Sequence, residues 1–197
     1  MNEWKEYKLG DVVTFGNGKE RPKAKGTIPV YGGNGILDFT NDYNYDGETI
    51  IIGRVGAYCG SVYYADKPIW VSDNALAAKV KGDNNPRFLY YFLRHLHLNG
   101  FAEGSSHPLV TQRLLNSIDI IVTNNVNVQK TIASILLSLD DKIDLLRREN
   151  DTLKQMAETL FRQRFIEDAK DEWKDGKLED LIDIKYGKDH KSLNDDL

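Results

Sequence analysis

Cysteine is almost absent from this chain, with Cys59 the single one among 197 residues. One thiol cannot form an intrachain disulfide, and it excludes a CxxC redox motif or a cysteine-rich zinc centre. The chain also lacks the apolar core of a signal peptide near its start, and no run approaches the ~18 apolar residues of a membrane span. These absences predict a cytoplasmic protein from a reducing compartment, with no membrane partner.

Positive net charge is missing as well. The chain has 30 acidic and 26 basic residues, which gives a formal net charge of −4. That balance argues against a protein that coats nucleic acid through its overall charge, but it leaves room for a local basic patch. The apolar fraction of 41% is typical of a globular protein with a buried core.

Proline and glycine are both absent between residues 128 and 166, whereas residues 1–125 alternate short apolar runs with glycine and asparagine. In that first part, strands are predicted over residues 49–52, 61–64, 69–71 and 118–122, with turns at 32–35 and 66–68. Asn85 as a cap and Pro86 at the first helical position predict a helix with an apolar face. The pattern indicates a compact, strand-rich α+β domain over residues 1–125.

Residues 126–168 are predicted to form one long helix, because their apolar residues step alternately by four and three. The seam positions of this heptad are Ile132, Leu136, Leu139, Ile143, Leu146, Asn150, Leu153 and Leu160. A helix of this length spans roughly 60 Å at about 1.5 Å per residue, more than its own domain needs. The seam predicts a coiled coil with a partner helix, in which the polar Asn150 specifies the register. The alternative is a helix that folds back onto its own domain.

The end of the chain repeats its beginning. Residues 172–188 match residues 3–19 without a gap, and Trp173 aligns with Trp4. Further identities pair Lys177 with Lys8, Leu178 with Leu9, Asp180 with Asp11, Gly187 with Gly18 and Lys188 with Lys19. Residues 169–197 are therefore predicted to be the start of a second copy of the first domain, truncated and frayed toward its polar end.

Several segments together resemble a known protein family. They are residues 4–11 (WKEYKLGD), 29–35 (PVYGGNG), 53–60 (GRVGAYCG), 70–75 (WVSDNA), 104–106 (GSS) and 129–136 (QKTIASIL). In these segments the chain is similar to the DNA-specificity subunits of type I restriction-modification systems. Such subunits look like two tandem units, each a target-recognition domain followed by a long helix, with the helices packed antiparallel. The chain departs from that pattern at residues 123–129, where the family has a proline-rich run and a Glu-Gln pair, and in having one recognition domain.

The resemblance implies a half-length specificity subunit that is not itself an enzyme. It would read one half-site of double-stranded DNA and dock the modification and restriction subunits of a type I deoxyribonuclease and adenine methyltransferase. S-adenosylmethionine, Mg²⁺ and ATP would then be bound by those partners and not by this chain. A homodimer formed through the long helices would rebuild two recognition domains and read a symmetric, bipartite site. The alternative is a degenerate coiled-coil remnant, or a decoy, that no longer binds DNA.

Candidate DNA contacts were chosen by chemistry, because base edges need forked donors or amides, and phosphates need cations and hydroxyls. The candidates are Lys19, Arg21, Lys23, Lys25, Arg54, Tyr58, Asn74, Ser105, Ser106, His107, Gln112 and Arg113. Several of these segments have a structural alternative. Residues 19–25 could be a solvated loop, Arg54 could pair with a core carboxylate, Asn74 could form an Asx turn, and Thr111 could cap a helix.

No catalytic or metal centre is predicted. The segment Asn85-Pro86-Arg87-Phe88 is superficially similar to the Asn-Pro-Pro-aromatic motif of adenine methyltransferases, but helix capping explains it and no G-x-G cofactor loop precedes it. His95 and His97 lie two apart on a helix and point to different faces. Asp140 and Asp141 lie on the polar side of the heptad, where a charged helix surface is the simpler explanation.

Overall fold

The computed structural model describes residues 4–104, 108–168 and 176–183. The chain divides into two compact units, Met1–Ile143 and Asp144–Leu197, which are described separately. In the described residues, no helix combines the length and the apolar character that crossing a membrane requires.

The first unit is built on a four-stranded antiparallel sheet. Its strand order is β2 (Val13–Asn17), β8 (Ala75–Val80), β5 (Thr49–Gly53) and β6 (Val62–Ala65). All five residues of β5 are buried because both faces of the sheet are covered. Ile50 and Ile52 belong to the main core with helix α2 (Pro86–His95), whereas Ile51 on the opposite face packs in a second, smaller cluster.

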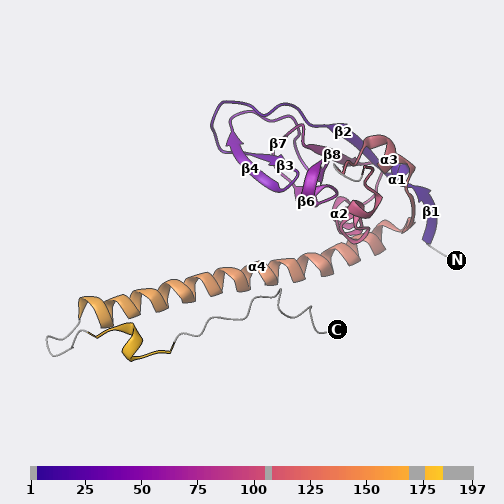
Figure 1. Cartoon of the computed structure of the whole chain (residues 1–197). Helices are drawn as coiled ribbons and strands as arrows, with labels where there is room; N and C mark the ends of the chain where they lie inside the picture. Colours follow the sequence, from indigo (N-terminus) through magenta and orange to yellow (C-terminus); the bar gives the residue numbers. More distant parts are fainter. Residues whose placement is uncertain (1–3, 105–107, 169–175, 184–197) are drawn as a thin grey trace, which may run out of the picture. The chain divides into compact units, whose positions relative to one another are not determined.

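Besides the start of the long helix, the described part of this unit contains two smaller sheets and four short helical segments, several of which are labelled in Figure 1. A three-stranded sheet has the order β4 (Gly35–Thr40), β3 (Ile28–Gly32) and β7 (Trp70–Val71), and β1 (Trp4–Lys8) pairs with β9 (Asp119–Thr123). The helical segments are α1 (Leu9–Val12), η1 (Gly56–Tyr58), η2 (Leu98–Phe101) and α3 (Gln112–Ser117). The predicted turn at 32–35 joins β3 to β4, and Gly35 there has the positive φ of 79° that favours glycine.

The α+β prediction is confirmed, with each predicted strand present and shifted by about one residue. The strand predicted over 69–71 covers only residues 70 and 71, because Ile69 instead makes an isolated bridge with Tyr45. The helix cap is also confirmed, since the Asn85 side chain accepts a hydrogen bond of 2.8 Å from the Phe88 amide.

The long helix α4 extends over Val126–Arg162 and is followed by one wider turn over Gln163–Glu167. Regular α-helical geometry therefore ends six residues before the predicted boundary at 168. Gln129 and Ala133 in its first turns are buried, and Ile132 packs against the main core. From residue 139 onward the apolar seam side chains are 44–61% exposed, namely Leu139, Ile143, Leu146, Leu153 and Leu160. Within the first unit, the fold-back alternative thus holds for the first turns of the helix.

The second unit contains the rest of α4 and a 3₁₀ turn, η4 (Leu178–Asp180). In this turn Leu178 and, just after it, Leu181 are exposed, whereas the aligned residues of the first copy, Leu9 and Val12, are buried in the main core. Most of the predicted repeat, and the end where fraying is expected, lie outside the described residues.

Candidate nucleic-acid interface

Three of the loops that carry candidate DNA contacts meet at one end of the four-stranded sheet. Because neighbouring strands run antiparallel, the ends of β2 and β5 lie beside the starts of β8 and β6. The loop that leaves β2 contains residues 19–25, the loop after β5 contains residues 53–58, and residues 72–74 lead into β8. The topology therefore gathers side chains that are up to 55 residues apart in the sequence.

Lys19 is held against the turn at residues 72–74. Its amide donates to the Val71 carbonyl at 3.0 Å, and its carbonyl accepts from the indole of Trp70 at 3.3 Å. The backbone approach is so close that a Cβ on Gly18 would lie 1.7 Å from the Ser72 carbonyl oxygen. Glycine is therefore required at position 18 for the two loops to meet.

Arg54, in the loop after β5, connects the turn at residues 72–74 to the segment that contains Val110. Its amide donates to the Asn74 carbonyl, and its own carbonyl accepts from the Val110 amide, both at 2.9 Å. Its side chain is half-buried, and its Nε is buried with no hydrogen-bond partner in the described part of the chain. Among the described residues, Arg54 forms no ion pair. Its predicted alternative role, an ion pair with a core carboxylate, is therefore wrong there.

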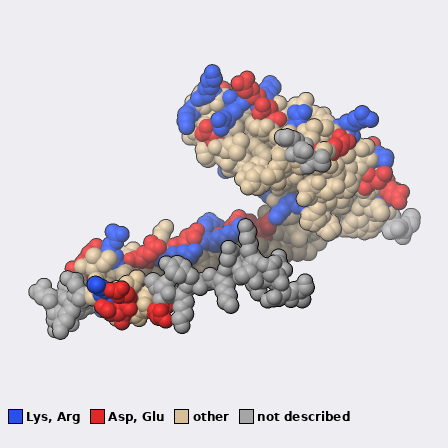
Figure 2. Space-filling view, in the orientation of Figure 1, with Lys and Arg blue, Asp and Glu red and all other residues tan. Residues whose placement is uncertain are grey.

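A groove of about 590 Å³ lies where these loops meet the β3–β4 hairpin. It is lined by Glu20, Arg21, Pro22, Lys23, Leu37, Asp38, Ser72, Asp73 and Asn74. Figure 2 shows basic and acidic side chains mixed over this corner of the unit. Such a lining offers each kind of group that reads base edges: cations for guanine and phosphate, carboxylates for the cytosine amino group, an amide for adenine and a leucine for the thymine methyl group.

Asn74 is exposed at the edge of the groove. The turn that carries it is closed by the backbone, through a hydrogen bond of 3.0 Å from the Ala75 amide to the Ser72 carbonyl. The Asx turn predicted as the alternative is wrong, since no hydrogen bond of the Asn74 side chain is present in the described residues. The side chain of Asn74 is thus available to a ligand.

The candidates near α3 lie in different surroundings. Thr111 caps this helix as predicted, because its Oγ1 accepts from the Leu114 amide at 3.1 Å. The Gln112 amide group is bound to the Asn17 side chain at 2.8 Å and faces the end of β2, which leaves Arg113 as the exposed candidate there. Tyr58 is also exposed, and Ser105, Ser106 and His107 lie outside the described residues.

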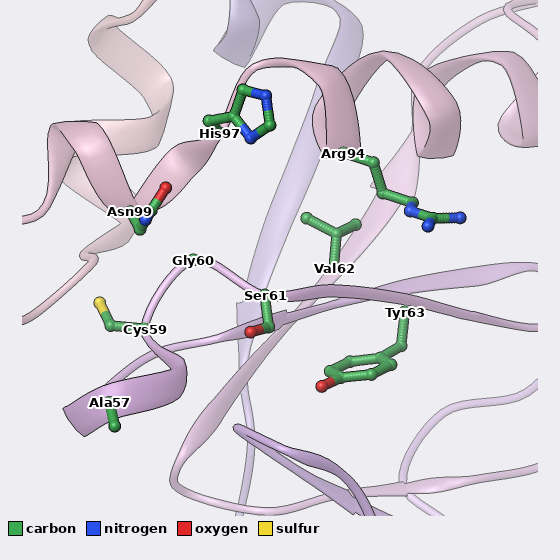
Figure 3. A pocket seen from close by; sticks show the side chains of 9 residues that line it. All are labelled: Ala57, Cys59, Gly60, Ser61, Val62, Tyr63, Arg94, His97 and Asn99. Carbon is green, nitrogen blue, oxygen red and sulfur yellow. The ribbon is translucent and has the colours of Figure 1, made fainter. Parts of the chain in front are cut away.

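A second pocket, which the sequence did not indicate, lies beside the start of β6. It measures about 340 Å³, and its polar lining includes Ser61, His97 and Asn99 around Cys59 (Figure 3). Burial raises the pKa of the Cys59 thiol, and its Sγ donates to the Arg54 carbonyl at 3.3 Å. The thiol therefore stays protonated and supports the loop that carries Arg54.

Gln129 is the most important polar residue that the sequence interpretation missed. It is fully buried at the start of α4 and makes three hydrogen bonds to two other segments. In the sequence it stands at the start of the family-like segment 129–136 and just before the apolar heptad, and neither position reveals its burial.

The features discussed as catalytic alternatives have structural roles. Arg87, which breaks the methyltransferase-like motif, lies 3.7 Å over the ring of Tyr64. Asp140 accepts a hydrogen bond from Tyr91 and lies 3.7 Å from Arg94. Over residues 4–104, 108–168 and 176–183, no group of three or more histidine, cysteine or acidic side chains is placed to hold a metal ion.

Comparison with known proteins decides the family. Residues 1–155 match the type I restriction modification DNA specificity domain. The chain belongs to this family. The EcoprrI specificity subunit of Escherichia coli is 29% identical over 146 residues, which cover 74% of this chain and 35% of that subunit. A putative specificity subunit of Haemophilus influenzae, S.HindORF215P, is 29% identical over 145 residues, 70% of this chain and 37% of the relative.

The specificity domain also has counterparts among solved structures. The S subunit of M. genitalium superposes with a TM-score of 0.69 at 22% identity, over 82% of this chain and 45% of that one. The HsdS subunit of Thermoanaerobacter tengcongensis gives a TM-score of 0.56, over 75% and 40%. The fold is thus that of a specificity subunit, and the chain spans less than half the length of these relatives. The expected non-catalytic role agrees with the names of the relatives.

Proposed function

We propose that this chain reads one half-site of double-stranded DNA for a type I restriction-modification complex. The observation that carries the proposal is the groove that joins the cationic loop at residues 19–25 to the turn at 72–74, beside Arg54. Fixed backbones and free polar side chains are what base recognition needs, because the donors must be held in place before DNA arrives. The recognition contacts would come from Arg21, Lys23, Arg54 and Asn74, with Lys19, Lys25, Tyr58 and Arg113 at the margins.

The exposed seam of α4 supports self-association. Five apolar seam side chains are 44–61% exposed, and each would contribute about 0.7–1.8 kcal/mol, about half the value for a fully exposed side chain, if a partner helix buried it completely. A second copy of this chain offers the complementary seam, with Asn150 of each copy restricting the register. The resulting homodimer would present two recognition domains to a symmetric bipartite site and would dock the modification and restriction subunits.

The test starts from purified chain and a pool of random double-stranded DNA, from which bound sequences are selected and read. The expected result is a bipartite site with symmetric halves, and methylation of adenine in that site when a modification subunit and S-adenosylmethionine are added. Enrichment of a single half-site would contradict the dimer but keep the recognition function. Complete lack of enrichment, with a modification subunit still bound, would favour the decoy alternative.

A further inference from the structure

The first turns of α4 are fastened to the recognition domain at two separate points, both within the first unit. The first point is Gln129, whose side chain is fully buried. Its carbonyl oxygen accepts from the Asn85 amide at 2.7 Å, and its amide nitrogen donates to the Asn84 side chain and the Thr123 carbonyl, both at 2.8 Å. One side chain thus joins the end of β9, the cap of α2 and the first turn of α4.

The second point is Asp140. It accepts a hydrogen bond of 2.9 Å from the Tyr91 hydroxyl and lies 3.7 Å from the Arg94 guanidinium, both on α2. Residues 129 and 140 are 11 apart, or about 16 Å along the helix at about 1.5 Å per residue. A single fastening would let these turns pivot, whereas two fastenings so far apart fix the direction of the part of α4 that belongs to the first unit.

We infer that Gln129 and Asp140 are positioning residues that set the permitted spacing between the two DNA half-sites. The inference rests on the proposed function, because the spacing arises only when two chains pair through α4. If the α4 helix of each chain is rigidly joined to the recognition domain of the same chain, pairing of the two helices through their seams fixes the distance between the two grooves. Each added base pair moves the second half-site by about 3.4 Å and turns it by about 35°, so a rigid dimer accepts few spacer lengths.

Two matched pairs of variants separate this role from general stability. Gln129→Met keeps the length of the side chain but removes its three hydrogen bonds, and Gln155→Met makes the same change on an exposed turn of α4. Asp140→Ala removes the second fastening, and Asp141→Ala changes its exposed neighbour. Asp140 is only partly buried, so its variant keeps the test informative if Gln129→Met folds poorly.

The experiment measures binding of the full chain to duplexes in which two half-sites, found by selection, are separated by spacers that grow one base pair at a time. The native chain, Gln155→Met and Asp141→Ala should share one narrow optimum. In Gln129→Met and Asp140→Ala we expect the preference for the optimal spacer over its neighbour to fall about tenfold, while binding to an isolated half-site is unchanged.

Each outcome has a distinct meaning. Identical spacer profiles in all five proteins would overturn the positioning role and leave the proposed function intact. A parallel loss of affinity at every spacer length would show that the two residues act only on stability, and would also overturn it. If the native chain binds no bipartite site, the proposed dimer fails and the positioning role fails with it, whereas half-site recognition fails only if an isolated half-site is not bound either.

Discussion

Arg54 lowers the stability of the free protein, and in the proposed complex its side chain contacts DNA. Its Nε is buried without a hydrogen-bond partner in the described residues, and such a group reduces stability by about 1–3 kcal/mol. The hydroxyl of Ser72, in the neighbouring turn, is also buried and has no hydrogen-bond partner among the residues that the structure describes. Buried unsatisfied polar groups are few in native proteins, so two of them where the loops meet favour Arg54 as a residue with a functional role.

Arg54→Met should therefore weaken DNA binding and raise stability. Methionine fills the space of the arginine stem without the unpaired nitrogen, so the free energy of unfolding should increase by about 1 kcal/mol. DNA affinity should decrease by about 1–3 kcal/mol, as for the loss of a base-reading arginine. Denaturant titration and fluorescence anisotropy check the two effects, with Arg162→Met on the exposed end of α4 as the control. A variant that loses stability as well as affinity would identify Arg54 as a structural residue.

The hydroxyl of Tyr91 makes stability sensitive to alkaline pH. Burial, and then the hydrogen bond to Asp140, hold the pKa of Tyr91 well above its ordinary value near 10. The native state keeps this proton at a pH where the unfolded chain loses it. The stabilisation is thus complete below about pH 10 and is lost as the pH rises further.

Tyr91→Phe should lower the free energy of unfolding at pH 7 by about 0.5–1.5 kcal/mol, because one hydrogen bond is lost. Above pH 10 its stability should decrease less steeply than that of the native chain. Some decrease remains, because burial and Glu48 also raise the pKa of Tyr64. Urea unfolding at several pH values from 7 to 11 gives both quantities. Tyr43→Phe, on an exposed side chain, should match the native curve, and the prediction is wrong if Tyr91→Phe matches it too.

At the scale of elements, the sequence predicted best what depends on local pattern. Helix α4 was predictable because its heptad spacing continues without a shift, and β5 because three consecutive isoleucines suit a strand covered on both faces. Strand β8 was missed because alanine favours helices, although here small side chains let both faces pack closely. Strand β4 was missed because its sequence does not alternate between apolar and polar residues. This agrees with the structure, in which its apolar residues Ile36, Leu37 and Phe39 are all exposed. The groove could not be predicted from local sequence patterns, because its loops are brought together only by the antiparallel strand order.

The loop at residues 19–25 should supply the salt dependence of DNA binding. Replacing Arg21, Lys23 and Lys25 together with glutamine removes three exposed cations. If all three contact phosphates, the slope of log affinity against log salt concentration should become less steep by about 2.7, or about 0.9 for each contact. Anisotropy titrations at several salt concentrations measure this slope. The same exchange at Lys142, Arg148 and Lys154 on α4 is the control, and an equal change there would assign the effect to overall charge.

For the molecule as a whole, the proposed function assigns recognition to the first domain and assembly to the long helix. The specificity domain carries a groove on fixed loops, and α4 carries an apolar seam that the described residues do not cover. In the proposed dimer, binding of one half-site would raise the effective concentration of the second recognition domain at the other half-site, so a bipartite site would be bound more tightly than a single half-site. Loss of pairing should therefore affect bipartite binding much more than half-site binding.

Leu146→Asp tests that division, and the helix provides its own control. Leu146 is a seam residue and Leu145 is the next residue off the seam, and the two are almost equally exposed, at 44% and 42%. A buried aspartate in each helix would make dimerisation unfavourable by several kcal/mol, so Leu146→Asp should sediment as a monomer at micromolar concentration. Its affinity for an isolated half-site should stay unchanged, while the advantage of a bipartite site, which can reach a factor of about 10²–10⁴, should disappear. Leu145→Asp should remain dimeric. If both variants sediment with the native mass and retain bipartite binding, the two copies pair through some other surface and the seam is not the interface.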